Sequence, residues 1–126
     1  MKEELRKVTI GTNNYTEVFA TDYKTFNAYH CYEIRPIPPE GATISEEDIF
    51  AKIKFQKGPI KEKGVNGCHN EDLIAIVIDR LQQFQESDFK CRENAIAITK
   101  LEEALMWLGK RTQDRRNRGV EGTSQL

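Results

Sequence analysis

The sequence predicts an α+β fold, with a small N-terminal antiparallel β-sheet followed by a C-terminal antiparallel helical hairpin. Three observations predict it. The first part of the chain is rich in β-branched and aromatic residues with frequent turn residues between them. Residues 57–69, KGPIKEKGVNGCH, have the glycines and lysines of a basic loop. From residue 70 the apolar residues change to a helical period. We therefore expect one domain over residues 1–126, divided into a β-sheet part (1–56), the basic loop (57–69), the hairpin (70–118) and a tail (119–126).

Four segments, 7–10, 17–21, 25–37 and 46–56, are expected to be the strands of the sheet. In the third, apolar and aromatic residues alternate from Phe26 to Ile34, and the prolines that begin at Pro36 end it. In the fourth, IFAKIKF alternates in the same way. This period of two predicts a strand with one buried face.

The two helices of the hairpin each have start and stop signals. Asn70 is a candidate cap for the first, which should end near Glu86. Ser87 or Asp88 is a candidate cap for the second, which should run to about Arg118. Gly119 follows and would end it. The apolar face of the first helix is formed by Leu73, Ile74, Val77, Ile78, Leu81 and Phe84.

The second helix has a heptad seam, which predicts packing against a partner helix. Trp107 and Met106 lie beside this seam and add more apolar surface than one partner helix would cover. Either this surplus marks a subunit interface, which would make the protein oligomeric through its hairpin, or Trp107 packs beneath the sheet. The seam consists of Asn94, Ile98, Leu101, Leu105, Leu108 and Thr112.

Composition narrows the classes of function. The net charge of −1 gives no global field for binding nucleic acid or an anionic membrane. No apolar run is long enough to span a membrane, and no signal peptide is expected. The three scattered cysteines indicate a reducing cytosol. His30 and His69 have no recognised metal-ligand spacing, and no nucleophile or nucleotide motif is found. We therefore expect no metal, no cofactor and no catalytic residue.

The strongest local charge feature is GKRTQDRRNRG at residues 109–119, with five cations and one aspartate. Arg111, Arg115 and Arg118 share one helical face, where each guanidinium could hold a phosphate with two parallel hydrogen bonds. The alternative is that these cations only complement the dipole of a helix C-terminus. Asn94 could fix the register of the seam or face a ligand, and Phe84 could stack on a base or pack in the core.

Distance limits how these candidates could act together. Arg111 lies 17 residues beyond Asn94, which is about 25 Å within one helix. Phe84 and Asn94 flank the turn of the hairpin, whereas the arginines lie at its open end. We therefore expect two hairpins, related by a two-fold axis, to bring Phe84 and Asn94 of one subunit to Arg111 and Arg115 of the other.

The segment RENAIAITKLEEALMWLGKRTQDRRNRGVEGT resembles the hairpin shared by phage anti-Thoeris and anti-CBASS sponges. The β-rich half followed by NGCHNEDLIAIVIDRLQQFQ resembles the Thoeris set in particular. The resemblance implies a non-enzymatic protein in the cytoplasm of the infected host that binds cyclic ADP-ribose isomers intact. It also implies a homodimer or hexamer, further sites for cyclic di- or trinucleotides, and a signal pocket made by Phe84, Asn94, Arg111 and Arg115.

Two other readings stay open. An enzyme that cleaves the same signal would need a general base or a metal near the arginines, and only Glu86, Glu93 and Asp114 are near in sequence. A phage regulator that binds nucleic acid would be consistent with the basic stretch. The near-neutral chain and the absence of a recognition motif count against that regulator.

Overall fold

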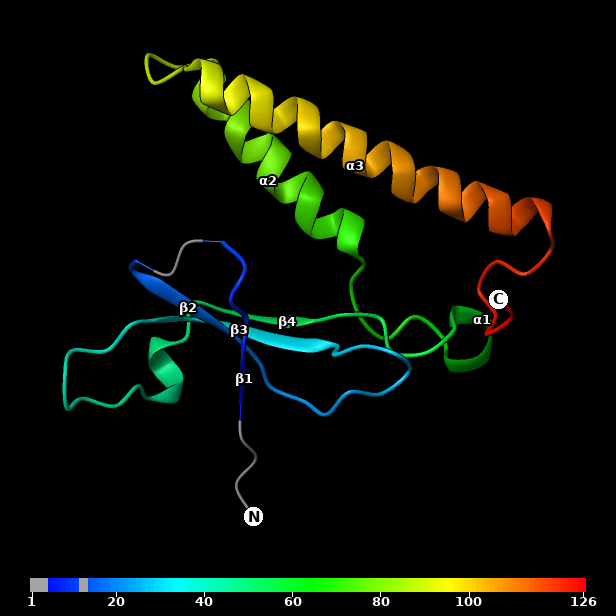
Figure 1. The fold of residues 1–126 in the computed structure, drawn as a ribbon, viewed down its shortest axis with the longest axis horizontal. Helices are drawn as coiled ribbons and strands as arrows, with labels where there is room; N and C mark the ends of the chain where they lie inside the picture. Colours follow the sequence, from blue (N-terminus) through cyan, green and yellow to red (C-terminus); the bar gives the residue numbers. More distant parts are fainter. Residues whose placement is uncertain (1–4, 12–13) are drawn as a thin grey trace. The chain divides into compact units, whose positions relative to one another are not determined.

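The computed structural model describes residues 5–11 and 14–126, which form two compact units (Figure 1). The first comprises residues up to Gly58 together with Val65–Cys68, and the second comprises Pro59–Gly64 and His69–Leu126. The first holds the β-strands and the second holds the helical hairpin. This arrangement confirms the α+β class and the order of its two parts. The single domain over the whole chain stays a prediction.

The first unit is built on a four-stranded antiparallel sheet with the strand order β1-β2-β3-β4. The strands are β1 (Arg6–Lys7), β2 (Thr16–Ala20), β3 (Cys31–Pro36) and β4 (Ala51–Lys54). Val18 pairs with Ile34 and Ala20 pairs with Tyr32, so their side chains share one face of the sheet. Ala20 is buried, and the core of this unit therefore lies on that face.

The third strand is shorter than predicted, because residues 25–28 form a tight turn. Thr25 and Ala28 exchange backbone hydrogen bonds of 2.9 and 3.1 Å, and Phe26 and Asn27 between them have φ values of 46° and 74°. Both values lie in the left-handed region, which is required at the two central positions of a type I′ turn. The alternation at Phe26 was therefore misread as strand, and the strand begins at Cys31.

Further boundaries differ from the prediction. The first strand was expected over residues 7–10 but is β1, Arg6–Lys7. Residues 46–56 hold a short 3-10 turn, η1 (Glu46–Asp48), ahead of β4. The Ser45 amide donates to Asp48 Oδ2 at 2.9 Å, which closes this turn. The basic loop contains one helical turn, α1 (Ile60–Lys63). Lys57 N–H donates to Asn66 Oδ1 at 2.7 Å, and Asn66 Nδ2 donates back to Lys57 O at 2.8 Å.

The second unit contains the predicted hairpin, made of α2 (Asn70–Gln85) and α3 (Arg92–Asn117). The predicted caps were wrong. The caps are His69, whose N–H donates to Asp72 Oδ2 at 2.8 Å, and Cys91. In the connection, the Gln85 side-chain amide exchanges two hydrogen bonds of 2.9 Å with the backbone of Cys91. No helix within residues 5–11 and 14–126 is long and apolar enough to cross a membrane.

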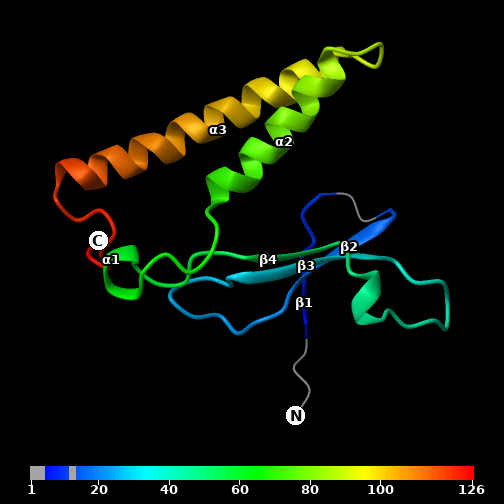
Figure 2. The same ribbon diagram turned by 180° about the vertical axis from the view of Figure 1, so that it is seen from behind.

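The helices run antiparallel, and α3 continues well past the start of α2 (Figure 2). The predicted seam positions of α3 are all half-buried, and Ile78 is buried in α2. α2 has 16 residues and α3 has 26. About ten residues of α3, or about 15 Å, therefore extend beyond α2. We call this part of α3, residues 108–117, the overhang.

Candidate functional site

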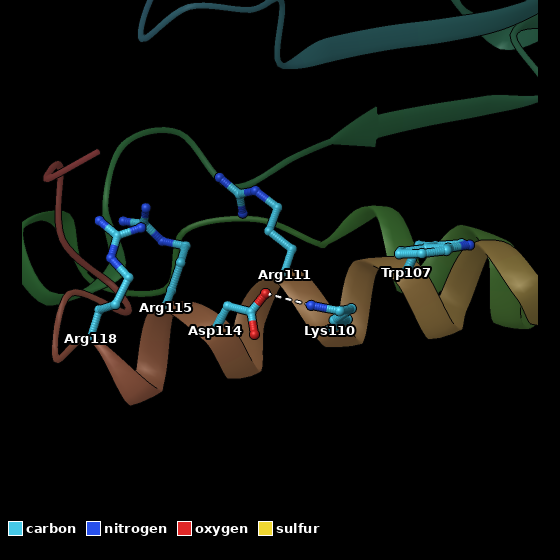
Figure 3. Close-up of a pocket in the computed structure, with 6 residues that line it drawn as sticks. All are labelled: Trp107, Lys110, Arg111, Asp114, Arg115 and Arg118. Carbon is cyan, nitrogen blue, oxygen red and sulfur yellow. Dashed lines mark hydrogen bonds and ion pairs between the residues drawn. The ribbon is translucent and has the colours of Figure 1, made fainter.

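Arg111 and Arg115 lie on the overhang, and Arg118 caps its end. The three side chains extend from the same side of the helix (Figure 3). Their spacing of four and three residues places them one above the next. Together they form the side of a hollow of about 350 Å³. The hollow is lined by Trp107, Lys110, Arg111, Asp114, Arg115 and Arg118.

The charge of the hollow comes from its arginines. Lys110 and Asp114 form an ion pair at 2.9 Å, one helical turn apart, so their charges largely offset each other. Arg111 is exposed and makes no hydrogen bond or ion pair with the part of the chain that the structure describes. Its five N–H donors are therefore available to a ligand from solution.

Arg115 is bound by the C-terminal tail, a contact that the spacing of the arginines did not predict. Its Nη2 donates to the carbonyl oxygens of Val120 and Thr123 at 3.1 Å and of Gln125 at 2.7 Å. Arg115 also continues the seam, three residues after Thr112, and it is half-buried. Because this part of α3 lies beyond the start of α2, the tail takes the place of α2 there. The continuing heptad spacing was the sequence signal for this inward position.

The tail folds back because the helix ends in a Schellman motif. Gly119 has a φ of 73°, and its N–H donates to Arg116 O at 3.0 Å. Val120 N–H donates to Arg115 O at 3.0 Å, and Val120 is buried. This geometry confirms the predicted helix stop at Gly119. The basic residues lie at the C-terminal end of α3, where they also interact favourably with the helix dipole. The alternative that they serve only this purpose is therefore consistent with the structure as well.

The other contacts of the tail are to α1, to Arg118 and within the tail itself. Lys61 N–H donates to Gly122 O at 2.8 Å, and Ser124 Oγ donates to Glu62 at 3.3 Å. Arg118 Nη2 donates to Leu126 O. The first turn of the tail is closed by Thr123, whose hydroxyl donates to Val120 O at 2.6 Å. Part of the predicted basic loop, Ile60–Lys63, is thus a support for the tail.

Phe84 and Asn94 lie at the other end of the hairpin. Phe84 is 37% exposed, and the Arg80 guanidinium lies 5.1 Å from the centre of its ring. Asn94 is half-buried in the first turn of α3. Because α3 is one continuous helix, Asn94 and Arg111 are about 25 Å apart. The structure therefore brings the three arginines together and leaves Phe84 and Asn94 distant from them within one chain.

Trp107 is 63% exposed and borders the arginine hollow. Met106, Ile76, Val77 and Ile96 on the same two helices are also exposed. So much exposed apolar surface on a small hairpin is typical of a protein–protein contact surface. Within residues 5–11 and 14–126, no three His, Cys, Asp or Glu side chains are grouped so that they could hold a metal ion.

The fold and the hollow define a small α+β protein whose helical hairpin presents cationic side chains suited to an anionic ligand. Residues 47–113 match the family model described as Acb2/Tad1, hairpin domain. The chain is also similar to Thoeris anti-defense 1 of Bacillus phage SBSphiJ7, with 47% identity over 143 aligned residues, covering 97% of this chain and 98% of the relative. The chain therefore belongs to the Thoeris anti-defense 1 family.

Proposed function

We propose that this protein is a phage anti-defence sponge, which binds cyclic ADP-ribose-type signals of the Thoeris system and holds them intact. The observation that carries the proposal is the row of arginines on the overhang, beside an open hollow. Membership of a family with an anti-Thoeris relative supports the same function. A protein of this kind would act in the cytoplasm of the infected bacterium.

The chemistry of the hollow suits the pyrophosphate of cyclic ADP-ribose. Two guanidinium groups one turn apart, Arg111 and Arg115, can each donate two parallel hydrogen bonds to one phosphate. The positions are set by a helix, which holds them more rigidly than a loop would. Arg111 is already exposed and free of partners in the described part of the chain. It is therefore the first contact that we assign to the ligand.

The adenine and ribose groups would be bound by Phe84 and Asn94. An aromatic ring stacks on a base with about 1–3 kcal/mol, and a side-chain amide can both donate to and accept from ribose hydroxyls. These two residues lie about 25 Å from Arg111 in one chain. We therefore propose a pocket shared by two subunits, with Phe84 and Asn94 from one and Arg111 and Arg115 from the other.

An oligomer is consistent with the exposed apolar residues of the hairpin. Ile76 is 63% exposed on α2, and Trp107 is equally exposed on α3. Burying a fully exposed isoleucine side chain contributes about 1.5–3 kcal/mol, so covering the exposed part of Ile76 contributes roughly 1–2 kcal/mol. A dimer with two-fold symmetry that covers these side chains would also have two identical pockets. The same proposal includes assembly into a homodimer or a hexamer. It also includes separate sites for cyclic di- or trinucleotides.

The proposal is tested by titrating the protein with a panel of cyclic ADP-ribose isomers in a calorimeter. The bound molecule is then recovered by denaturing the protein and is identified by mass spectrometry. We expect saturable binding and recovery of the unaltered isomer. Recovery of ADP-ribose or another product would indicate the competing enzyme and would overturn the sponge. Binding only to nucleic acid, with strong salt dependence, would favour the phage regulator.

The matched variants for this titration are Arg111→Ala and Lys110→Ala. Both remove a cation from the wall of the hollow. Lys110 is paired with Asp114, whereas Arg111 is unpaired in the described part of the chain. We expect Arg111→Ala to abolish binding and Lys110→Ala to weaken it only slightly. Equal losses from both would mean that general charge, and not the arginine row, attracts the ligand.

A further inference from the structure

We propose that the C-terminal tail is an internal competitor of the ligand: its backbone carbonyls occupy Arg115 and Arg118, and a phosphate must displace them to bind. This inference rests on the proposed function, because it concerns the same arginines. We call residues 120–126 the strap. Three carbonyls of the strap bind Arg115 Nη2 and a fourth binds Arg118 Nη2.

The strap and a phosphate compete for the same nitrogen. A guanidinium can grip a phosphate through Nε and Nη2 or through Nη1 and Nη2, so both bidentate modes use Nη2. Nη2 carries two N–H groups, and the three carbonyl oxygens at 2.7–3.1 Å engage both of them. A bidentate phosphate on Arg115 is therefore incompatible with the complete set of strap contacts.

The start of the strap is anchored to the rest of the unit, whereas its end can be displaced. Val120 is buried, and Gly122 O accepts the Lys61 amide of α1 at 2.8 Å. From Ser124 to the end, the residues are exposed. The end of the strap can therefore leave while its start stays fixed. Arg111 is outside the strap, so it can take the first phosphate contact before the strap releases Arg115.

The Thr123 side chain offers a small perturbation of the strap. Its hydroxyl donates to Val120 O at 2.6 Å and accepts the Gln125 amide at 3.3 Å. These two bonds bend the strap so that its carbonyls converge on Arg115. Thr123→Val keeps the shape of the side chain and removes both bonds. The matched control is Thr99→Val, because Thr99 also donates its hydroxyl to a backbone carbonyl, Ala95 O at 3.2 Å, at an exposed site in α3.

The experiment measures the affinity of these variants for inorganic pyrophosphate by calorimetry. Loss of one or two net hydrogen bonds from the competitor should tighten pyrophosphate binding by about twofold to tenfold in Thr123→Val. Thr99→Val should bind like the wild type. A second variant, Gln125→Gly, loosens the strap by adding backbone freedom and should act in the same direction. Hydrogen–deuterium exchange of residues 123–126 in the wild type should become faster when pyrophosphate is added.

Three results would overturn the strap as a competitor. One is unchanged or weaker pyrophosphate binding in Thr123→Val and Gln125→Gly, since weaker binding would mean that the tail positions Arg115 for the ligand. Another is an unchanged rate of exchange in the tail on addition of pyrophosphate. The third is absence of pyrophosphate binding in every variant. If the strap behaves as expected while no cyclic ADP-ribose isomer binds, only the proposed function fails.

Discussion

Mixing two inactive variants provides the sharpest test of the shared pocket. Asn94→Ala removes the amide at the start of α3, and Arg111→Ala removes a guanidinium about 25 Å away on the same helix. If each pocket takes these two groups from different subunits, each variant alone has no intact pocket. In a mixed dimer, one pocket lacks both groups and the other has both. Mixing the two variants should therefore restore binding of the cyclic ADP-ribose isomer, although neither variant binds it alone.

The size of the recovery follows from two-fold symmetry. With equal amounts of the two variants and free exchange of subunits, about half of the dimers are mixed, and each has one intact pocket of two. About one quarter of all pockets should thus regain wild-type affinity. Calorimetry would report this as about one quarter of the wild-type stoichiometry with an unchanged dissociation constant. Exchange of subunits is verified by native mass spectrometry of mass-tagged chains.

The control is a mixture of Asn94→Ala with Phe84→Ala, because both residues contribute from the same side of the proposed pocket. In that mixed dimer one pocket lacks the amide and the other lacks the ring, so no pocket is complete. Recovery in this control, or no recovery in the first mixture after proven exchange, would refute the two-subunit geometry. Strong binding by either single variant would refute the assignment of its residue.

Three further predictions concern the stability of the scaffold, each measured by urea unfolding. Gly119→Ala places a Cβ at a φ of 73° and should lower the free energy of unfolding by about 1–2 kcal/mol. Its control is Gly109→Ala, which adds a Cβ within α3 where there is open space. This control should raise the free energy of unfolding by about 0.5–1 kcal/mol. Gln85→Leu removes both side-chain bonds to Cys91 and should cost about 1–3 kcal/mol. Gly67→Ala puts a Cβ 2.4 Å from the Phe55 carbonyl group and should destabilise the sheet unit by about 1–3 kcal/mol.

Each of these predictions has a result that would contradict it. Equal effects at Gly119 and Gly109 would show that backbone conformation does not decide them. A neutral Gln85→Leu would mean that solvent replaces the clamp at the hairpin connection without loss. Unchanged unfolding of Gly67→Ala would mean that the backbone beside Phe55 separates easily to admit the methyl group.

The helical half of the chain was predictable because its signals are local. The change to a helical period, the seam and Gly119 set the helix type and its end to within about a residue. The caps were mistaken because Asn70 and Ser87 have good capping side chains. Helix starts depend on backbone conformation as well, and His69 and Cys91 have the extended backbone of a cap.

The sheet half was predicted in kind and less well in detail. Alternation from Phe26 to Ile34 looks continuous in the sequence, but Phe26 and Asn27 adopt the left-handed conformation. A bulky aromatic residue gives no warning of such a turn. Strand ends depend on pairing with distant residues, for example Ala51 with Ile34. A pattern of residue types therefore identifies the strands without fixing their lengths.

Within the candidate site, the common face of the three arginines followed directly from their spacing. What could not be predicted is that the C-terminal tail already binds two of them, Arg115 and Arg118. The contacts to Arg115 come from main-chain oxygens, and every residue has such an oxygen, so no side-chain motif marks them. The exposure of Trp107 also depends on where α2 begins, which is a property of the whole hairpin.

Because α3 is continuous, it fixes both the distance and the angle about the helix axis between the residues at its two ends. Asn94 and Arg111 are joined by helix alone, so inserting or deleting one residue between them would rotate the arginines by about 100° about the axis. Steps of seven or of eleven residues turn the arginines by only about 20° and change the span by about 10 Å or about 16 Å. Adapting the hairpin to a ligand of another size would therefore require insertions or deletions of these particular lengths.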